Sequence, residues 1–371
     1  MRRPVRRVLA PLAFALFSSF LASTAQSQIL IGQSVGITGT VAATVAEADQ
    51  GAQMLFDHVN AQGGIHGQKI ELIRMDDQFD VKRTLDNAKT LIEQRNVLAL
   101  FMTRGTPNTQ ELIPLLDQQG VALIGPSTGA IALSKPVQRH VYNVRATYQR
   151  ETEKAVNLLT TVGVRDIAVV YANDSFGKDA LIGAQRGLSA ANLTAVAEVP
   201  ADRISPDYAS IIPQVAKAHA VIWVGSGTPV ANGIKALRAA GSGAQVVTLS
   251  NNASAGFVKE LGDKSKGVIV TQVFPSERAL AHPFVGEAAA LAKGKLELSP
   301  AVLEGFASAK VMVEALRRAG PKPSRSQLVN ALNTMQSYDL GGGLTINYTA
   351  QDHSGITYAD SSIVSGGRFM R

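Results

Sequence analysis

One stretch of eight residues, Asn60-Ala61-Gln62-Gly63-Gly64-Ile65-His66-Gly67, separates a helical pattern from a strand pattern. Before it, apolar residues recur at helical spacing at Ala52, Leu55, Phe56 and Val59. After it, residues 69–75 read Lys-Ile-Glu-Leu-Ile-Arg-Met, which is typical of a strand. Glycine takes positive φ at little steric cost, so the glycine pair can end the helix. The stretch predicts a helix, a tight turn and a strand in succession.

The same alternation continues along most of the chain. Near-continuous apolar strands between helices indicate parallel sheets that are buried on both faces. Strands are expected at 29–35, 70–75, 97–102, 121–124, 167–171, 196–199, 220–224, 246–249 and 268–273. Helices are expected near 47–61, 82–95, 109–119, 149–162, 176–191, 207–218, 229–240, 283–294, 300–319 and 324–336.

The alternation is interrupted twice, and each interruption indicates a passage between two α/β lobes. It breaks near 142–145 and then restarts, which predicts a crossing from a first lobe to a second. Residues 273–275 are the expected return crossing, because the chain is mostly helical after Pro275. The chain then ends in Gly341-Gly342-Gly343 and short β-like runs at 344–348 and 356–364.

The stretch at 60–67, followed by Asp76-Asp77 and Asp80, resembles the Asn-Ala-x-Gly-Gly-Ile-x-Gly segment of type I periplasmic solute-binding proteins. These are the leucine/isoleucine/valine-binding-protein-like receptors of ABC importers. The resemblance covers nearly the whole chain after residue 27. It implies an α/β fold of two doubly wound parallel-sheet lobes joined by three crossover strands, the third within 345–357. Lobe 1 would comprise 28–145 and 275–350, and lobe 2 would comprise 146–274 and 351–371.

The first residues have the features of an export signal. Four arginines, at positions 2, 3, 6 and 7, precede an apolar stretch at 8–21 and then small residues. We expect a signal peptide over 1–27, cleaved near Ala25 or Ser27, and a periplasmic protein. The alternative is a membrane anchor, but the apolar stretch is shorter than the roughly 20 residues that a membrane span needs.

Composition narrows the possible partners. Without the leader arginines, the net charge falls from +7 to about +3, and the remaining Lys and Arg are scattered, so nucleic acid is not an expected partner. The chain has no cysteine, hence no disulfide, thiolate nucleophile or lipid-anchor cysteine. Its histidines form no zinc pattern, and it lacks a nucleotide-binding glycine loop after the first strand. We expect no cofactor, no metal and a monomer.

The loops that follow the strands are rich in Gly, Ser and Thr. In open parallel sheets, ligands bind beyond the carboxyl ends of the strands. Hydroxyls and backbone N–H groups at helix N-termini suit a carboxylate, although ordinary capping explains any one loop equally well. The loops lie at 36–44, 103–106, 125–129, 172–177, 225–228 and 250–252.

The resemblance carries individual residues into this site. Thr106 corresponds to the hydroxyl residue that binds the ligand carboxylate, and Ser127 and Thr128 match the next loop. Phe176 stands where an aromatic side chain packs on the ligand. Thr44 replaces a tyrosine, and Tyr148 is either a cleft aromatic or a core residue. The full expected set is Thr38, Thr44, Thr106, Ser127, Thr128, Tyr148, Phe176, Ser226, Gly227 and Ser250.

Two departures from the family pattern concern the ligand. Amino-acid binders of this family hold the ammonium with an acidic residue after a late strand of lobe 2. Here that loop reads Ser250-Asn251-Asn252, and no aromatic follows Trp223 in the neighbouring loop. A buried ammonium needs a compensating charge or several acceptors; Asp174 could provide that charge, but no feature of the sequence assigns it this role. The carboxylate half of the site is kept and the ammonium half is altered, which favours an organic or aromatic acid.

One enzymatic alternative arises from Gly125-Pro126-Ser127-Thr128-Gly129, which matches the Gly-x-Ser-x-Gly nucleophile elbow of α/β-hydrolases. His353 follows late enough for the triad order. Pro136 comes soon after the serine and leaves little room for the helix behind such an elbow. The non-enzymatic interpretation is preferred: a binding protein that captures a small carboxylate-bearing solute for an ABC permease in the inner membrane. A receptor for a membrane sensor protein remains the other option.

Overall fold

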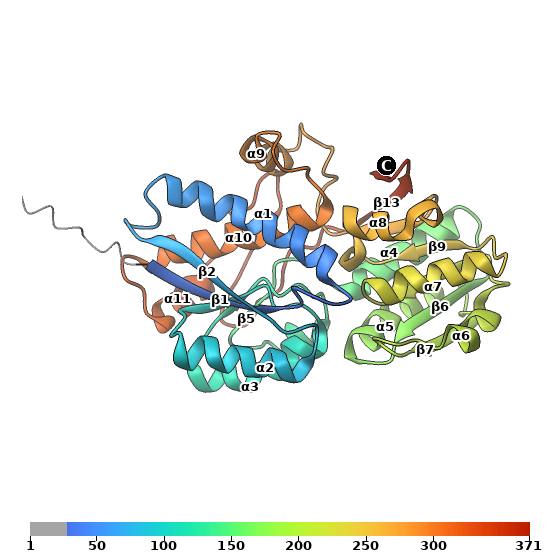
Figure 1. Cartoon of the computed structure of the whole chain (residues 1–371), viewed down its shortest axis with the longest axis horizontal. Coiled ribbons are helices and arrows are strands. Elements are labelled where there is room, and N and C mark those ends of the chain that lie inside the picture. The colour runs from blue at the N-terminus through green and yellow to red at the C-terminus, as the bar shows by residue number, and fades with distance from the viewer. Residues whose placement is uncertain (1–27) are drawn as a thin grey trace, which may run out of the picture.

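The computed structural model describes residues 28–371, in two lobes that lie side by side (Figure 1). The expected signal peptide over 1–27 and its cleavage positions lie outside the described residues. Within residues 28–371, no helix is both long and apolar enough to cross a membrane. We call the five-stranded sheet with its helices lobe 1, and the seven-stranded sheet with its helices lobe 2.

Lobe 1 is built on a parallel sheet with the strand order β2-β1-β3-β4-β5. Helices α1 and α10 cover one face of this sheet, and α2 and α3 cover the other (Figure 1). Its strands are β1 (Gln28–Val35), β2 (Lys69–Asp76), β3 (Ala99–Phe101), β4 (Leu123–Ile124) and β5 (Val141–Tyr142). Its helices are α1 (Ala42–Ala61), α2 (Val81–Lys89), α3 (Thr106–Gln119), α9 (Pro283–Ala292), α10 (Pro300–Ala319) and α11 (Arg325–Asn333).

Lobe 2 is built on a sheet with the order β14-β13-β10-β9-β8-β6-β7. In this sheet β13 pairs antiparallel with β10, and β14 pairs antiparallel with β13. Helices α4 and α5 pack on one face, and α6, α7 and α8 pack on the other. The strands are β6 (Ile167–Ala172), β7 (Ala197–Ala201), β8 (Ala220–Val224), β9 (Gln245–Thr248), β10 (Ile269–Gln272), β13 (Asp360–Ser365) and β14 (Arg368–Met370). The helices are α4 (Tyr148–Thr161), α5 (Ser175–Ala190), α6 (Tyr208–Val215), α7 (Thr228–Ala239) and α8 (Ala255–Leu261).

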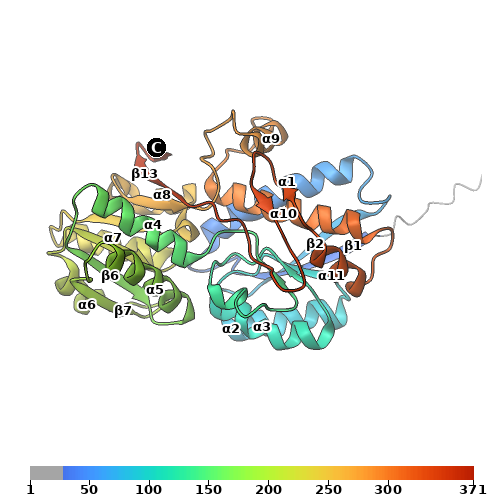
Figure 2. The same cartoon turned by 180° about the vertical axis from the view of Figure 1, so that it is seen from behind.

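Three segments connect the lobes. The chain leaves lobe 1 after β5, returns after β10, and passes to lobe 2 again before β13 (Figure 2). A small antiparallel ribbon, β11 (Tyr338–Asp339) with β12 (Thr345–Ile346), precedes the last passage. The fold class expected from the sequence is therefore confirmed, whereas the lobe boundaries at 145, 274 and 350 stay a prediction.

Several predicted elements have different ends in the structure. The strands expected at 97–102 and 121–124 shorten to β3 and β4, and the helix expected at 207–218 ends at Val215. The helix expected to start at 109 begins at Thr106, because Gly105 adopts φ 94° and turns the chain into it, with Pro107 in the first turn. This early start matters, because it places Thr106 at a helix N-terminus.

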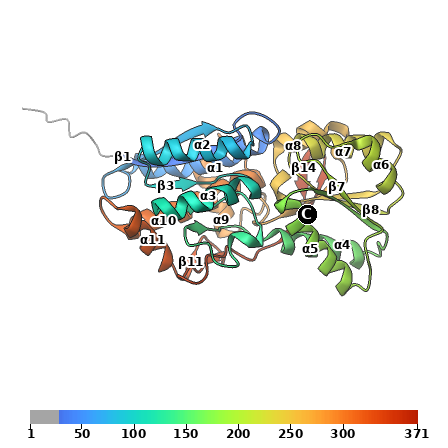
Figure 3. The ribbon, with the colours of Figure 1, turned by 90° about the horizontal axis from the view of Figure 1, so that it is seen from below.

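The lobes share part of their apolar core. One cluster of buried side chains includes Leu100 and Leu112 of lobe 1 together with Tyr148 and Phe176 of lobe 2. In the view from below, α3 and α5 approach each other where the lobes meet (Figure 3). The lobes therefore touch along one side of the cleft, and the strand ends of both sheets face it.

Candidate functional site

A small cavity lies between the lobes, and the side chains that line it leave little free space in this arrangement. Its walls come from loops that follow strands in both sheets, as expected for an open parallel sheet. Lobe 1 contributes Phe79, Arg104, Gly105, Thr106, Pro107 and Ser127, and lobe 2 contributes Tyr148, Ala172, Asp174, Phe176, Arg203, Ser226 and Asn251.

Arg104 is the central charged group of this cavity. It is 3 % exposed, and its Nη2 donates to the Asn251 carbonyl of lobe 2 at 2.6 Å, while Nη1 donates to Ser127 Oγ at 3.3 Å. Among residues 28–371, no carboxylate lies within 4.0 Å of its guanidinium, and its Nε has no hydrogen-bond partner. Burial lowers the pKa of Arg104, but arginine remains charged at neutral pH. The cavity therefore contains a cation without a paired anion.

Two hydroxyl groups of lobe 1 lie beside this cation. Thr106 begins α3, and its Oγ1 is 2.7 Å from the Oγ1 of Thr128. Ser127 follows β4, and its hydroxyl donates to Glu304 at 2.9 Å. A helix N-terminus carries partial positive charge, so this part of the wall favours a negatively charged group.

Aromatic rings of lobe 2 form another part of the wall. Tyr148 and Phe176 pack at a centroid distance of 4.6 Å, and the guanidinium of Arg145 lies 4.8 Å from the centre of the Tyr148 ring. Burial raises the pKa of Tyr148, so its phenol stays neutral at physiological pH. This wall offers apolar surface to the rest of a ligand.

Arg203 crosses the cleft from lobe 2 to lobe 1. Its guanidinium stacks on the Phe79 ring at 3.7 Å, and Nη2 donates to Asn108 Oδ1 at 2.6 Å. Its Nε lies 3.9 Å from Asp174 Oδ2 in its own lobe. Burial lowers the pKa of Arg203. Arg203 thus covers one side of the cavity and holds the two lobes together.

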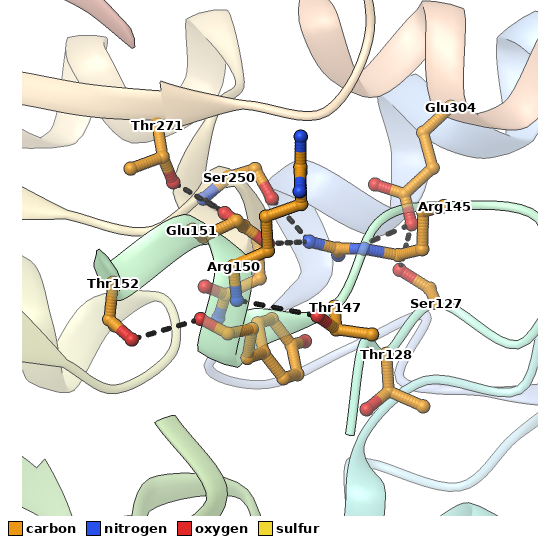
Figure 4. A network of polar contacts seen from close by, with 12 residues as sticks. Ser127, Thr128, Arg145, Thr147, Arg150, Glu151, Thr152, Ser250, Thr271 and Glu304 are labelled. Carbon is orange, nitrogen blue, oxygen red and sulfur yellow. Dashed lines mark hydrogen bonds and ion pairs between the residues drawn. The ribbon is translucent and has the colours of Figure 1, made fainter. Parts of the chain in front are cut away.

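A buried ionic network lies behind the cavity, where the chain first passes between the lobes (Figure 4). Arg145 donates to Glu151 of α4 and to Ser250, and its Nη1 lies 3.6 Å from Glu304 of α10. Glu151 also accepts from the Ser250 backbone N–H at 3.0 Å and from the Thr271 hydroxyl. Despite burial, which disfavours the charged form, Glu304 and Glu151 raise the pKa of Arg145. One arginine therefore links a carboxylate from each lobe.

Half of the ligand-binding residues expected from the sequence line the cavity: Thr106, Ser127, Tyr148, Phe176 and Ser226. Two more do not line the cavity but hydrogen-bond to residues close to it: Thr128 bonds to Thr106, and Ser250 accepts from Arg145. The other three lie elsewhere. Thr38 is exposed and bonds to Asp76, Thr44 faces Ser254 across the lobes at 3.0 Å, and Gly227 packs against Thr40.

Sequence reasoning did not single out the charged residues of the site. Arg104 lies in a loop that was expected at the cleft, next to Thr106, so its position carried a signal. Phe79 lies within the Asp76–Asp80 stretch that carries the resemblance but was not expected at the site, and Arg203 follows another strand in a loop without a family motif. Glu151 and Glu304 lie on helices, where a carboxylate is usually exposed. Asp174 was considered for an ammonium, and the structure places it in the wall.

The esterase alternative does not hold. The Ser127 hydroxyl donates to Glu304, and no hydrogen bond joins it to a histidine anywhere in residues 28–371. His353 instead stacks on Tyr142 at 4.1 Å and bonds to the Gln138 carbonyl at 2.9 Å. The segment after Ser127 forms a short 3₁₀ turn at 131–133, not the helix of a nucleophile elbow.

Two lobes, three connections and a polar cavity between strand ends define a two-lobe solute-binding protein. The sequence confirms this class, since a model of the periplasmic binding protein family matches residues 28–363. The chain belongs to this family, within its Leu/Ile/Val-binding-protein-like group of non-enzymatic solute-binding proteins.

Several relatives resemble the chain over almost its whole length. A substrate-binding periplasmic protein from Ralstonia solanacearum has a TM-score of 0.84 and 32 % identity, covering 91 % of this chain and 98 % of that one. A possible leucine/isoleucine/valine-binding protein from Rhodopirellula baltica has a TM-score of 0.83 and 26 % identity, with coverages of 91 % and 94 %. Leu/Ile/Val-binding protein homolog 3 of Brucella melitensis is 23 % identical over 356 residues, with coverages of 92 % and 93 %.

Proposed function

We propose that this protein is the periplasmic component of an ABC importer and captures a small carboxylate-bearing solute between its lobes. The observation that carries the proposal is Arg104, a buried cation that faces the cavity without a carboxylate partner among the described residues. A buried charge is costly unless it is paired, and a ligand carboxylate would supply the missing anion. The Thr106 hydroxyl lines the same cavity and can donate to the same carboxylate.

The connections between the lobes support capture by a hinge motion. The cavity is lined from both sides, so a ligand that touches both walls favours the closed arrangement over an open one. Closure changes the surface formed by the two lobes together, and a permease in the inner membrane can distinguish that surface from the open form. The Leu/Ile/Val-binding names of the relatives agree with this class of cargo.

A ligand panel tests the proposal. The full chain is expressed, purified from the periplasm, unfolded and refolded to remove host ligand, and then heated with amino acids, organic acids and aromatic acids. A ligand at 100 times its Kd stabilises by about 2.7 kcal/mol, which raises Tm by several degrees. We expect carboxylates to raise Tm and the corresponding primary amides not to do so. A panel in which only uncharged compounds raise Tm would overturn the proposal.

The variant Arg104→Gln provides the matched control. It keeps a hydrogen-bond donor towards lobe 2 but removes the charge, so carboxylate affinity should fall by about 10- to 100-fold. The variant Arg150→Gln, at an exposed position on α4, should leave affinity unchanged. Equal affinities of the two variants for the same acid would show that Arg104 does not bind the ligand.

A further inference from the structure

We infer that the ligand is a carboxylic acid without a charged amine, whose second polar group is a neutral hydrogen-bond donor such as a hydroxyl. This inference rests on the proposed function and concerns the part of the cavity wall that lobe 2 contributes, with Asp174, Arg203, Ser226 and Asn251. It depends on which acceptor atoms of that wall already have a partner within the protein.

Asp174 is the one carboxylate in the cavity wall among the described residues, and it already has partners. Its Oδ1 caps helix α5 by accepting from the Gly177 N–H at 3.0 Å. Its Oδ2 is buried and accepts no hydrogen bond from the described residues, but it forms an ion pair with the Arg203 Nε at 3.9 Å, and the positive end of α5 lies beside it. The negative charge of Asp174 is therefore balanced within lobe 2.

Arg203 cannot easily leave this position. Its guanidinium is held by Asn108 at 2.6 Å and by the Phe79 ring at 3.7 Å, and its side chain is 17 % exposed. A ligand ammonium next to Asp174 would stand beside this fixed cation. Like charges in a partly buried site raise the cost of the second one, so the ammonium would be disfavoured.

The other two carboxylates near the site are also occupied. Glu151 receives Arg145, Thr271 and the Ser250 N–H, and Glu304 receives Ser127 and faces Arg145. Neither belongs to the cavity wall. The charge that stays without a contact partner is thus positive, at Arg104, and the site selects for a negative ligand group.

Within the described part of the chain, two buried acceptors in the cavity wall have no hydrogen bond: Asp174 Oδ2, which lies 3.9 Å from the Arg203 Nε, and Asn251 Oδ1, which is neutral. Asn251 Nδ2 donates to the Gly225 carbonyl and to Ser226 Oγ, both at 2.9 Å, which fixes the orientation of the amide. Its Oδ1 is buried and has no hydrogen-bond partner among the described residues. An amide oxygen pairs well with a neutral O–H or N–H donor, and the Ser226 hydroxyl lies beside it.

Matched pairs of ligands test the inference on the refolded full-chain protein. Each pair shares one skeleton: leucine with 2-hydroxy-4-methylpentanoate, phenylalanine with 3-phenyllactate, and 4-(aminomethyl)benzoate with 4-(hydroxymethyl)benzoate. Calorimetry gives Kd for each member. We expect the hydroxy member of the binding pair to have a Kd at least about tenfold lower than its amine partner.

Two variants examine the physical cause. Arg203→Gln removes the cation beside Asp174, so it should shift the hydroxy-to-amine selectivity at least about tenfold towards the amine. Asp174→Asn retains an N-cap for α5 and removes the one carboxylate of the wall, and in this variant the hydroxy acid should still have a Kd at least about tenfold lower than that of its amine partner. This second variant keeps the test valid if Arg203→Gln fails to fold.

The outcomes separate the two proposals. If an amine member binds as tightly as its hydroxy partner, the inference is wrong while carboxylate capture stands. If Asp174→Asn abolishes binding of a bound acid, Asp174 is a ligand-holding group and the inference is again wrong. If no carboxylate in the set binds, the proposed function and the inference both fall.

Discussion

Gly227 of lobe 2 lies against the carbonyl of Thr40 in lobe 1. It adopts φ 60°, and a Cβ at this position would lie 1.8 Å from the Thr40 oxygen. The next residue, Thr228, donates its N–H to the same oxygen at 3.0 Å. Gly227→Ala should therefore keep the lobes from reaching this arrangement, and ligand affinity should fall at least about tenfold. Calorimetry, together with the radius of gyration from solution scattering, measures both effects.

Gly241→Ala is the control for backbone strain. Gly241 is also in lobe 2 with φ 78°, but a Cβ there would meet no atom within 4 Å. Both variants carry the cost of a positive φ, roughly 1 kcal/mol. Only Gly227→Ala should bind less tightly, and equal affinities would show that the Gly227–Thr40 contact has no part in binding.

The two threonines expected at the site should differ in their effect. Thr106→Val removes a hydroxyl from the cavity wall and should weaken carboxylate binding by about 1–3 kcal/mol, since a buried charged group loses a donor. Thr38→Val removes an exposed hydroxyl that bonds to Asp76, and Kd should stay within about twofold. Titration calorimetry on one acid compares them. A large loss of affinity in Thr38→Val would show that the β1–α1 loop takes part in ligand binding.

The network around Arg145 should matter for stability. Glu151→Gln leaves Arg145 with one carboxylate in a dry environment, and breaking such a buried pair costs about 3–5 kcal/mol in the free energy of unfolding. Glu153→Gln, on the exposed face of the same helix, should cost less than about 0.5 kcal/mol. Urea unfolding followed by circular dichroism gives both values, and similar losses would show that the network is not a main source of stability.

His353 should make stability depend on pH. Burial lowers its pKa in the folded protein, whereas the unfolded chain has the ordinary value of about 6.5. Below about pH 6.5, the unfolded state binds a proton that the folded state does not, so stability falls as the pH decreases towards the lowered pKa. The stability advantage of the wild type over His353→Gln should therefore be smaller at pH 5.5 than at pH 7.5.

His219 supplies the comparison, because its side chain is 68 % exposed and pairs with Asp166 at the surface. His219→Gln should show a much weaker pH dependence in the same urea experiments. A difference between wild type and His353→Gln that stays constant between the two pH values would contradict the argument.

The fold could be predicted from local pattern because each strand is a short apolar run between amphipathic helices. The run Ala220–Val224 is buried at every position, so period and length alone identify it. The short strand β5 could not be recognised in this way. Its two residues, Val141 and Tyr142, are a strand only because β4 lies beside them, and the sequence around them reads as a crossing.

The site was predictable where family position coincides with a loop after a strand, as at Thr106 and Ser127. It was not predictable where function depends on pairing between distant residues. Whether Arg104 is a free cation depends on which carboxylates other arginines occupy, and Glu151 and Glu304 are separated from it by many residues. The spacing of residues along the chain does not indicate which arginine each of these carboxylates pairs with.

The crossing of α1 and α10 limits how this pocket could be redesigned. A Cβ at Gly51 would lie 1.9 Å from the Val302 carbonyl, and one at Gly305 would lie 1.8 Å from the Ala48 carbonyl. The two helix backbones are therefore in direct contact. Because Glu304 is next to Gly305, this contact also fixes the position of Glu304. Arg203 lies in a loop between β7 and α6, and it is held by its contacts with Asn108 and Phe79 and not by a crossing of helix backbones. A protein engineer who wants a biosensor for a new metabolite should vary the Arg203 loop first and leave the Glu304 helix intact.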